Sequence, residues 1–435
     1  MKSGEWRKRL RFCHATNNLP AASLEKTLHM KLKYFIPAIL ILLLISCNKE
    51  NPDVPGEPAD LNLKDGSEFV IESMNEFGLD IFRLLNEDEE DDVNIFISPT
   101  SISLALAMTL NGANTSTEDS MAFAMRMDHL PPDQINETYR DLMAGLKTCD
   151  EKVLLEIANS IWYREGYPVE QDFLDINEEY YNAEVRELDF FSPEAIGTIN
   201  NWVADNTHDK ITEIIKVIDP QTIMFLINAI YFKGVWAIEF DEDDTHDATF
   251  QNADNSASTV KMMHMEDTIG YYENELFQAC ELDYGRGNFS MLVFLPKYDV
   301  TIDEVISELN EDNWNTWLGS FYKTEVNLNI PRFKFEYEKE LNDVLKLMGM
   351  EIAFDPWLAD FSGINPTDQL YISYVKHKTF VEVNEEGTEA AAVTVVAVNL
   401  CSAMANYMIV DRPFLFAIRE KTTNTTLFIG KVAGL

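Results

Sequence analysis

Basic residues are scarce in this chain. Its 435 residues include 34 Lys and Arg against 74 Asp and Glu, which gives a formal net charge of −40 at pH 7. A surface this negative repels phosphate and sulfate groups, so we expect neither a nucleic-acid partner nor a heparin-like cofactor. Apolar residues make up 46% of the chain, which is ordinary for a folded protein, so the charge indicates a well-solvated surface.

Cysteine is also scarce. Only five cysteines occur, and two of them, Cys13 and Cys47, lie outside the predicted folded body. The other three, Cys149, Cys280 and Cys401, are an odd number and lie far apart in the sequence. We therefore expect no structural disulfide, and the packing of apolar side chains must supply the stability.

The common catalytic and metal-binding motifs are missing. HExxH, paired CxxC, a P-loop, GxSxG and GxGxxG are absent, and the seven histidines show no metal-ligand spacing. Neighbouring carboxylates are frequent, but 74 acidic residues produce such pairs by composition alone. The sequence thus predicts a protein that is not an enzyme and uses no cofactor or metal.

A short apolar stretch near the N-terminus is typical of a signal peptide. Lys31 and Lys33 precede an apolar run over residues 34–45, which is too short to cross a bilayer as a helix. The run closes on Leu44-Ile45-Ser46-Cys47, which resembles the lipobox of bacterial lipoproteins, in which the cysteine is lipidated. We predict a lipoprotein signal peptide at 30–46 and lipidation of Cys47; the alternative is an ordinary secreted signal in which Cys47 has no role. The expected location is a bacterial membrane, with the outer membrane or cell surface as candidates.

The rest of the chain divides into three segments. Residues 1–29 are basic on balance, in contrast to the acidic remainder of the chain, and are interpreted as a start-site extension. Residues 47–66 are rich in Pro, Asp and Glu and predict an acidic, flexible tether. Residues 67–435 contain no internal repeat and no linker, so we predict a single domain there.

Periodic patterns predict both helices and strands. Apolar residues recur every three or four positions at the start of the body, which predicts a helix, and the acidic run 86–92 should follow it as a loop. The residues of this helical pattern are Val70, Met74, Phe77, Ile81 and Leu84. A second, short helix is expected over 341–348, ended by Gly349.

Strand patterns are strongest in the last third of the chain. Apolar and polar residues alternate over 326–330 and resume out of phase over 333–337, so Pro331 is interpreted as a bulge or a strand end. Two apolar runs, 413–418 and 426–432, predict a buried hairpin. Together these patterns predict a mixed α and β fold with large antiparallel sheets.

Several blocks of the sequence resemble the serpins. They occur in the family's order and span essentially 67–435: NIFISPTSISLALAMTLNGANTSTEDSM, LINAIYFKGVWAIEF, IPRFKFEYEKELNDVLKLMGM, ADFSGI, VNEEGTEAAA, DRPFLFAIRE and LFIGKV. The resemblance implies an α+β fold with about nine helices around three mostly antiparallel β-sheets and an exposed reactive-centre loop. It also implies a suicide inhibitor, which an endopeptidase attacks in the loop and which then traps the protease as a covalent acyl-enzyme. We expect the inhibitor to be a monomer.

A ribbon almost free of charge occupies the position of that loop. From Gly387 to Val410 the only charged residue is Glu389, which would lie on the opposite face of a strand from the small and β-branched residues. Those residues are Thr388, Ala390, Ala392, Thr394, Val396, Val398 and Leu400. Such a ribbon can become the middle strand of a sheet without burying a charge.

The position of the scissile bond is open by one residue. Spacing counted forward from Gly387 puts it after Cys401, and spacing counted back from the DRPFLF block puts it after Ser402. A bond after Leu400 is the third alternative, and Ala403 is the neighbour on the other side. Because the ribbon has no Lys or Arg, we expect elastase-like, subtilisin-like, chymotrypsin-like or cysteine proteases rather than trypsin-like ones. Cys401 is interpreted as a side chain for a specificity pocket rather than a redox group.

The resemblance also implies structural roles for two groups of residues. The hinge of the loop comprises Glu385, Glu386, Gly387, Thr388, Glu389, Ala390, Ala391 and Ala392. A polar cluster beneath the place where the sheet opens, with a tryptophan at the top of the opening, comprises Ser98, Ser101, Asn200, Asn228, His377 and Trp236. Ordinary buried polar side chains would give the same residues. Two departures from the family pattern are Asp209, where Gly is usual, and Val393, which is bulkier than the usual residue.

An alternative function remains open. A non-inhibitory serpin that acts as a binding or carrier lipoprotein would typically carry Pro or bulky or misplaced charged residues in its hinge. Residues 387–392 of this hinge carry none of these. A purely structural or adhesive lipoprotein would leave the composition of the ribbon unexplained.

Overall fold

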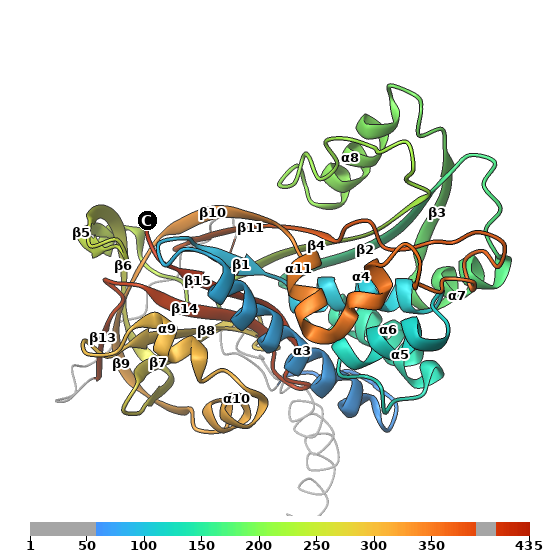
Figure 1. Ribbon diagram of the computed structural model, residues 1–435. Helices are drawn as coiled ribbons and strands as arrows, with labels where there is room; N and C mark the ends of the chain where they lie inside the picture. The colour runs from blue at the N-terminus through green and yellow to red at the C-terminus, as the bar shows by residue number, and fades with distance from the viewer. Residues whose placement is uncertain (1–57, 389–405) are drawn as a thin grey trace, which may run out of the picture. The chain divides into compact units, whose positions relative to one another are not determined.

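Two β-sheets and the helices that pack on them form the described part of the chain (Figure 1). The computed structural model describes residues 58–388 and 406–435, which belong to a unit that begins at Val54. Among the paired strands that are described, only β2 with β3 and β13 with β9 run parallel. The predicted α+β fold with mostly antiparallel sheets is thereby confirmed.

The larger sheet has nine strands, in the order β1-β15-β14-β8-β7-β6-β9-β13, with β5 paired to β6. Their bounds are β1 Ile95–Ile97, β5 His246–Gln251, β6 Ala257–Glu273, β7 Phe277–Tyr284, β8 Phe289–Pro296, β9 Tyr322–Pro331, β13 Asn406–Ile409, β14 Phe414–Glu420 and β15 Thr426–Val432.

The smaller sheet has six strands, in the order β10-β11-β12-β4-β2-β3. Their bounds are β2 Val153–Arg164, β3 Ala183–Leu188, β4 Met224–Val235, β10 Phe333–Glu340, β11 Lys376–Asn384 and β12 Gly387–Thr388.

The described residues form nine α-helices, as expected. Their bounds are α3 Ser67–Asp88, α4 Pro99–Leu110, α5 Thr115–Ala124, α6 Pro132–Leu146, α7 Gln171–Tyr181, α8 Ala195–Asn206, α9 Ile302–Ser307, α10 Glu311–Leu318 and α11 Asn342–Leu345. None of the helices in residues 58–388 and 406–435 has both the length and the apolar character needed to cross a membrane.

Hydrogen bonding joins the strands into two sheets rather than three. Strand β6 has 17 residues and pairs along most of its length with β5 and β9 and at its end with β7. Because β6 pairs with all three of these strands, the larger sheet is continuous through β6, and the described strands form two sheets where three were expected.

The first predicted helix forms, but it is longer than expected. Val70, Met74, Phe77 and Ile81 are buried on α3, in agreement with the spacing. The helix runs to Asp88 and takes in the start of the acidic segment that was expected to be a loop. The segment 86–88 contains neither Gly nor Pro, so nothing in it ends a helix.

The chain passes from one sheet to the other at Pro331. Strand β9 of the larger sheet ends at Pro331, and β10 of the smaller sheet begins two residues later at Phe333. The out-of-phase alternation therefore marks a strand end, which was one of the two interpretations of Pro331.

The predicted C-terminal hairpin is confirmed. Strands β14 and β15 pair antiparallel, with an irregularity between Ile418 and Arg419. The fully buried carboxylate of Glu420 accepts hydrogen bonds from the backbone N–H and hydroxyl groups of Thr422 and Thr423, at 2.7–2.9 Å. The polar link of the hairpin is thus held by one buried side chain.

The structure differs from the predicted tether in its last residues. Residues 58–66 pack on the body, where Leu61 is buried against Gly145 of α6. The backbone N–H of Ala59 donates to Asn288 Oδ1, and Asn288 Nδ2 donates back to the Ala59 carbonyl. Because the segment contains few apolar residues, its composition did not indicate that Leu61 packs on the body or that the backbone of Ala59 makes two hydrogen bonds.

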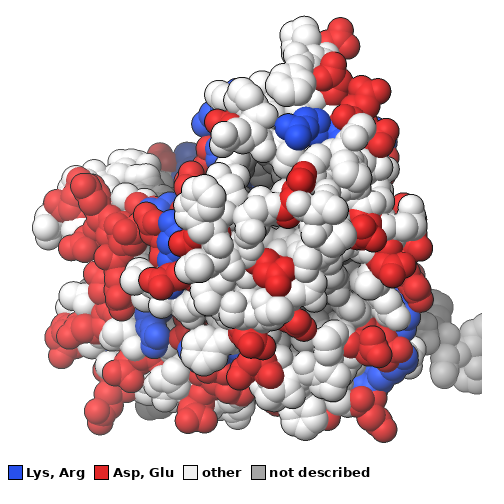
Figure 2. All heavy atoms as spheres, turned by 45° about the vertical axis from the view of Figure 1, so that its right-hand side comes forward, with Lys and Arg blue, Asp and Glu red and all other residues white. Residues whose placement is uncertain are grey.

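Acidic residues outnumber basic residues on the face of the molecule that Figure 2 shows. Figure 2 shows Asp and Glu side chains spread over one face of the molecule, with few Lys and Arg between them. This distribution agrees with the net charge of −40 and concentrates the negative charge where water can solvate it.

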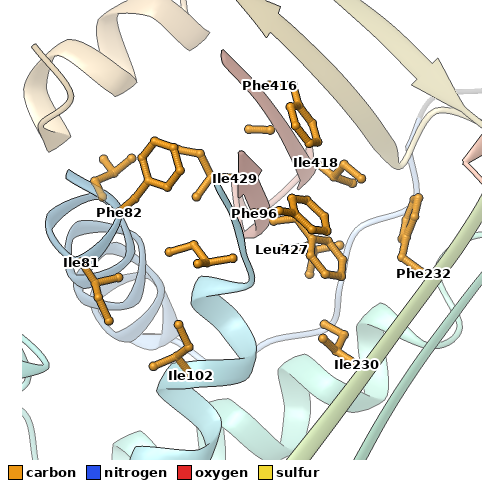
Figure 3. Packing of buried hydrophobic residues seen from close by; sticks show 14 of the residues in the cluster. Ile81, Phe82, Phe96, Ile102, Ile230, Phe232, Phe416, Ile418, Leu427 and Ile429 are labelled. Atoms are coloured by element: carbon orange, nitrogen blue, oxygen red, sulfur yellow. The ribbon is translucent and has the colours of Figure 1, made fainter. Parts of the chain in front are cut away.

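The core lies between the two sheets and the helices, and aromatic rings stack within it (Figure 3). Phe96 of β1 stacks on Phe416 of β14 and Phe428 of β15, with ring centroids 5.4 and 5.2 Å apart. Phe232 of β4 meets Phe428 edge to face, so this cluster also joins the two sheets. A second apolar cluster, which includes Trp162 and Ile199, packs α8 on the other face of the smaller sheet.

Candidate functional site

The two-residue strand β12 begins a strand position that the described residues leave otherwise unfilled. β12 pairs antiparallel with β11 through Val383 and Thr388, and with β4 through Gly234 and Thr388. Beyond these pairs, no described strand pairs with the facing edges of β4 and β11. The two neighbours therefore face each other across a gap one strand wide, which we call the strand gap.

Gly387 occupies a place where only glycine fits. Its φ of 152° lies in the region that favours glycine, and a Cβ atom there would overlap the carbonyl oxygen of Gly234. Thr388 is buried, and its hydroxyl shares a hydrogen bond with the Tyr284 hydroxyl, 2.6 Å between oxygens. Burial raises the pKa of Tyr284, so the pair stays neutral.

Trp236 holds the turn between β11 and β12. Its indole Nε1 donates to the Asn384 carbonyl at 2.9 Å, and its backbone N–H donates to the Glu386 carbonyl at 2.8 Å. The ring stacks on Tyr284 with centroids 4.3 Å apart and planes 13° from parallel. The residue predicted for the top of the opening therefore binds the backbone on both sides of Glu385, once through its side chain and once through its own backbone N–H.

Glu385, whose side chain is buried, forms an ion pair at the same turn. Only 2% of its side chain is exposed, and Arg332 Nε donates to its two carboxylate oxygens at 2.5 and 2.6 Å. The Thr245 hydroxyl donates to Oε1 at 2.5 Å. The sequence analysis placed Glu385 in the hinge but missed Arg332, Thr245 and Tyr284. One sequence feature could have indicated this ion pair: Arg332, one of the few basic residues, directly follows the strand end at Pro331.

Three of the predicted cluster residues lie together at the start of α4 and β11. Ser98 caps α4, and its hydroxyl oxygen accepts the Ser101 N–H at 3.2 Å while donating to the Leu427 carbonyl at 2.7 Å. The Ser98 N–H donates to His377 Nε2 at 3.0 Å. Burial lowers the pKa of His377 to about 3, so its imidazole is neutral at physiological pH.

Asn228 lies near this group, whereas Asn200 and Trp236 do not join it. Asn228 Nδ2 donates to Asn159 Oδ1 at 2.7 Å, and Asn228 lines the same cavity as Ser101 and His377. The Asn200 side chain instead binds the backbone of Ile214 and Ile215 at 2.8–2.9 Å, on the α8 side of the sheet. Asn200 thus orders the wall of the cavity from outside.

The cavity occupies the lower part of the strand gap. Its volume is about 480 Å³, and it lies between the first half of β4, the start of β11 and helix α4. Ile102 and Leu106 of α4 and Ile227 and Ile230 of β4 provide much of its apolar wall. The remaining polar wall residues include Ser101, Asn228 and His377.

The remaining predicted residues fall in two groups. Asp209 adopts a left-handed φ of 61°, and its N–H donates to the Ala204 carbonyl, so the turn after α8 keeps a glycine-like conformation at some cost in strain. The other predicted positions lie outside the described residues: Cys47, Glu389, Ala390, Ala391, Ala392, Val393, Leu400, Cys401, Ser402 and Ala403.

Comparisons with known proteins agree with this architecture. The family model described as Serpin (serine protease inhibitor) matches residues 72–434. The chain is 37% identical to the leukocyte elastase inhibitor of Sus scrofa, over 82% of this chain and 97% of that protein. It is 36% identical to an uncharacterized serpin-like protein of Thermococcus kodakarensis, over 85% and 87% respectively.

Solved structures give the same result. The thermophilic serpin tengpin in its native state matches with a TM-score of 0.79 and 32% identity, over 88% of this chain and 98% of that chain. Human thyroxine-binding globulin with its ligand matches with a TM-score of 0.78 and 29% identity, over 85% and 99%. With the family model covering nearly all of the described body, this chain belongs to the serpin family.

Proposed function

We propose that this serpin is a suicide inhibitor of endopeptidases, in which the cleaved reactive-centre loop inserts into the strand gap. The observation that carries the proposal is the gap itself. Strand β12 already occupies its first two positions, with hydrogen-bonded neighbours on both sides. A segment that continued β12 would satisfy the facing edges of β4 and β11 and bury apolar area.

The register of β12 fits the composition of the ribbon that continues it. Extended without a slip, it would place Ala390 between Phe232 and Val381, and Ala392 between Ile230 and Thr379. Small residues would thus face the bulky core side chains. Thr394 would lie between Asn228 and His377, where a hydroxyl can hydrogen-bond to polar neighbours.

The proposed trap separates the two halves of the protease reaction. The protease nucleophile attacks the carbonyl carbon of Cys401 or Ser402, the peptide bond from that carbon to the next residue's nitrogen breaks, and the C-terminal peptide leaves with a new N-terminus. The acyl-enzyme ester or thioester then stays attached to the inserting strand. Inhibition requires that insertion be faster than attack of water on this bond.

The expected targets follow from the ribbon, which offers no Lys or Arg to a trypsin-like specificity pocket. Elastase-like, subtilisin-like and chymotrypsin-like enzymes are the proposed targets, and one relative is named an elastase inhibitor. We further propose export and a lipid anchor on Cys47, which would hold the inhibitor at a bacterial membrane where it meets external proteases.

The test is to mix residues 48–435 with pancreatic elastase, subtilisin, chymotrypsin, papain and trypsin, and to run denaturing gels. A complex that survives denaturant with one of the first four enzymes, but not with trypsin, is the expected result. Mass spectrometry of the released C-terminal peptide identifies the scissile bond. Cleavage without a complex by every enzyme would overturn the inhibitor proposal in favour of a binding or carrier role.

A further inference from the structure

The cavity in the strand gap contains polar groups that its apolar surroundings leave without partners. Asn228 Oδ1 is buried and accepts no hydrogen bond. Ser101 Oγ and His377 Nδ1 also have no partner among the described residues, although these side chains are only 4% and 6% exposed. Since all three residues line the cavity, a molecule inside it can reach them.

The hydrogen bonds that His377 and Asn228 make away from the cavity determine whether their cavity-facing atoms are donors or acceptors. His377 Nε2 accepts the Ser98 N–H, so the neutral imidazole carries its proton on Nδ1 and can donate. Asn159 Nδ2 donates to the Tyr181 carbonyl, so its Oδ1 must accept from Asn228 Nδ2, and Asn228 Oδ1 is left as an acceptor. The wall therefore presents at least one donor and one acceptor.

Among the described residues that line the cavity, both basic residues are already paired with carboxylates. Lys376 and Lys378 line the cavity, but both form ion pairs with Glu338 of β10. Asp368 adds a carboxylate to the wall. A neutral hydroxyl both donates and accepts, so it matches the Asn228 and His377 groups better than a carboxylate does.

We infer that the cavity is a binding site for a small, neutral, largely apolar molecule that carries a hydroxyl group. Its apolar body would contact Ile102, Leu106, Ile227 and Ile230, and its hydroxyl would bind Asn228 and His377. The volume of about 480 Å³ lies within the range of roughly 300–1,000 Å³ that small-molecule sites occupy.

Such a ligand would regulate the inhibitor, and this consequence rests on the proposed function. The ligand and the inserting strand would compete for the same space beside β4 and β11. Ligand binding would therefore lower the yield of covalent complex and raise the yield of cleaved, uninhibited product. Conversely, a loop already inserted would exclude the ligand.

The test uses three probes that share one ring system: 2-naphthol, naphthalene and 2-naphthoate. Titration calorimetry and probe fluorescence with intact residues 48–435 should give saturable binding of 2-naphthol at one site. Naphthalene should bind roughly 2- to 10-fold more weakly because it lacks the hydroxyl. The carboxylate should bind more weakly than either, because it would enter the cavity without a counter-charge.

Two variants locate the site. Ala105→Phe adds a ring to the cavity floor formed by α4 and should abolish saturable 2-naphthol binding. Ala257→Phe adds the same ring at the exposed start of β6 and should leave binding unchanged. Asn228→Leu should remove the preference for 2-naphthol over naphthalene, and circular dichroism checks that each variant is folded.

The outcomes separate this inference from the proposed function. Absence of saturable 2-naphthol binding, or binding that Ala105→Phe leaves intact, would overturn the ligand site whether or not the protein traps proteases. Binding with the expected probe order, in a protein that forms no covalent complex, would establish the site and reject the inhibitor. If all three probes fail to bind, the cavity holds water alone and the inference is wrong.

Discussion

At the residue scale, Thr388 and its neighbour Glu389 provide a direct test of loop insertion. Thr388 is buried at the start of the strand gap, where an arginine would place a charge among Tyr284 and the core without a partner. Thr388→Arg should therefore abolish covalent complex formation and leave the loop cleavable. The matched control is Glu389→Arg, the same new side chain on the opposite face of the proposed strand, which should still inhibit. Equal inhibition by both variants would contradict insertion through this gap.

Burial of His377 predicts how the free energy of unfolding depends on pH. The unfolded chain takes up a proton on this histidine near pH 6.5, whereas burial keeps the folded pKa at about 3. Acidification between these values therefore favours the unfolded chain, and between pH 7 and 5 it should cost about 2 kcal/mol of unfolding free energy. His377→Gln keeps an acceptor for the Ser98 N–H without the titration.

The measurement compares urea unfolding of the wild type and His377→Gln at pH 7 and pH 5. The wild type should lose about 2 kcal/mol more than the variant over this interval. Parallel losses in the two proteins would mean that the imidazole gains a proton without unfolding the site, and hence that it is less enclosed than the structure indicates.

At the element scale, the turn between β11 and β12 is held by a pair with unequal surroundings. Glu385 is 2% exposed, whereas Arg332 is 41% exposed. Removing the arginine with Arg332→Ala strands a buried carboxylate, which should cost about 3 kcal/mol. Glu385→Gln leaves Arg332 free to turn toward water and should cost only about 1 kcal/mol. Urea unfolding of the two single variants and the double variant measures both values and their coupling; a larger cost for Glu385→Gln would contradict the burial argument.

A comparison of several elements shows which structural features could be predicted from the sequence. Local spacing was enough for α3 and for the β14–β15 hairpin, because the buried face of an element repeats along the chain. Spacing contains no information about which distant strands pair, so the passage between sheets at Pro331 and the continuous β6 were not predicted. The Arg332–Glu385 pair was missed for the same reason, since 53 residues separate its members.

The residues of the candidate site were also predicted only in part. The resemblance to a family identified Ser98, Ser101 and His377, which the structure brings together, and Asn228, which lines the same cavity. It grouped Asn200 with them, although this side chain orders the backbone on the other face of the sheet. A match to a family motif shows that a residue type recurs at a position. It does not show on which face of a sheet the side chain lies, which only the structure gives.

At the scale of the whole molecule, the strand gap means that the described fold has not reached its largest possible number of strand pairs. Within residues 58–388 and 406–435, the facing edges of β4 and β11 pair with β12 over two residues. In the described residues this gap coexists with a dense aromatic core and a well-paired larger sheet. Under the proposed function, the stability that one more strand would add is gained only after the loop is cut.

Cleavage of the loop should consequently make the protein more stable, not less. A strand of about twelve residues with two neighbours adds on the order of ten backbone hydrogen bonds, each worth about 1 kcal/mol net. For a domain of this size the Tm should rise by roughly 10–20 °C. Circular dichroism melts before and after limited cleavage by subtilisin provide the measurement, with Thr388→Arg as the control, because its cleaved loop should stay outside and its Tm should not rise. A wild-type Tm that stays constant or falls on cleavage would mean that the gap is closed by other means, and the energy for trapping a protease would then have no source in this fold.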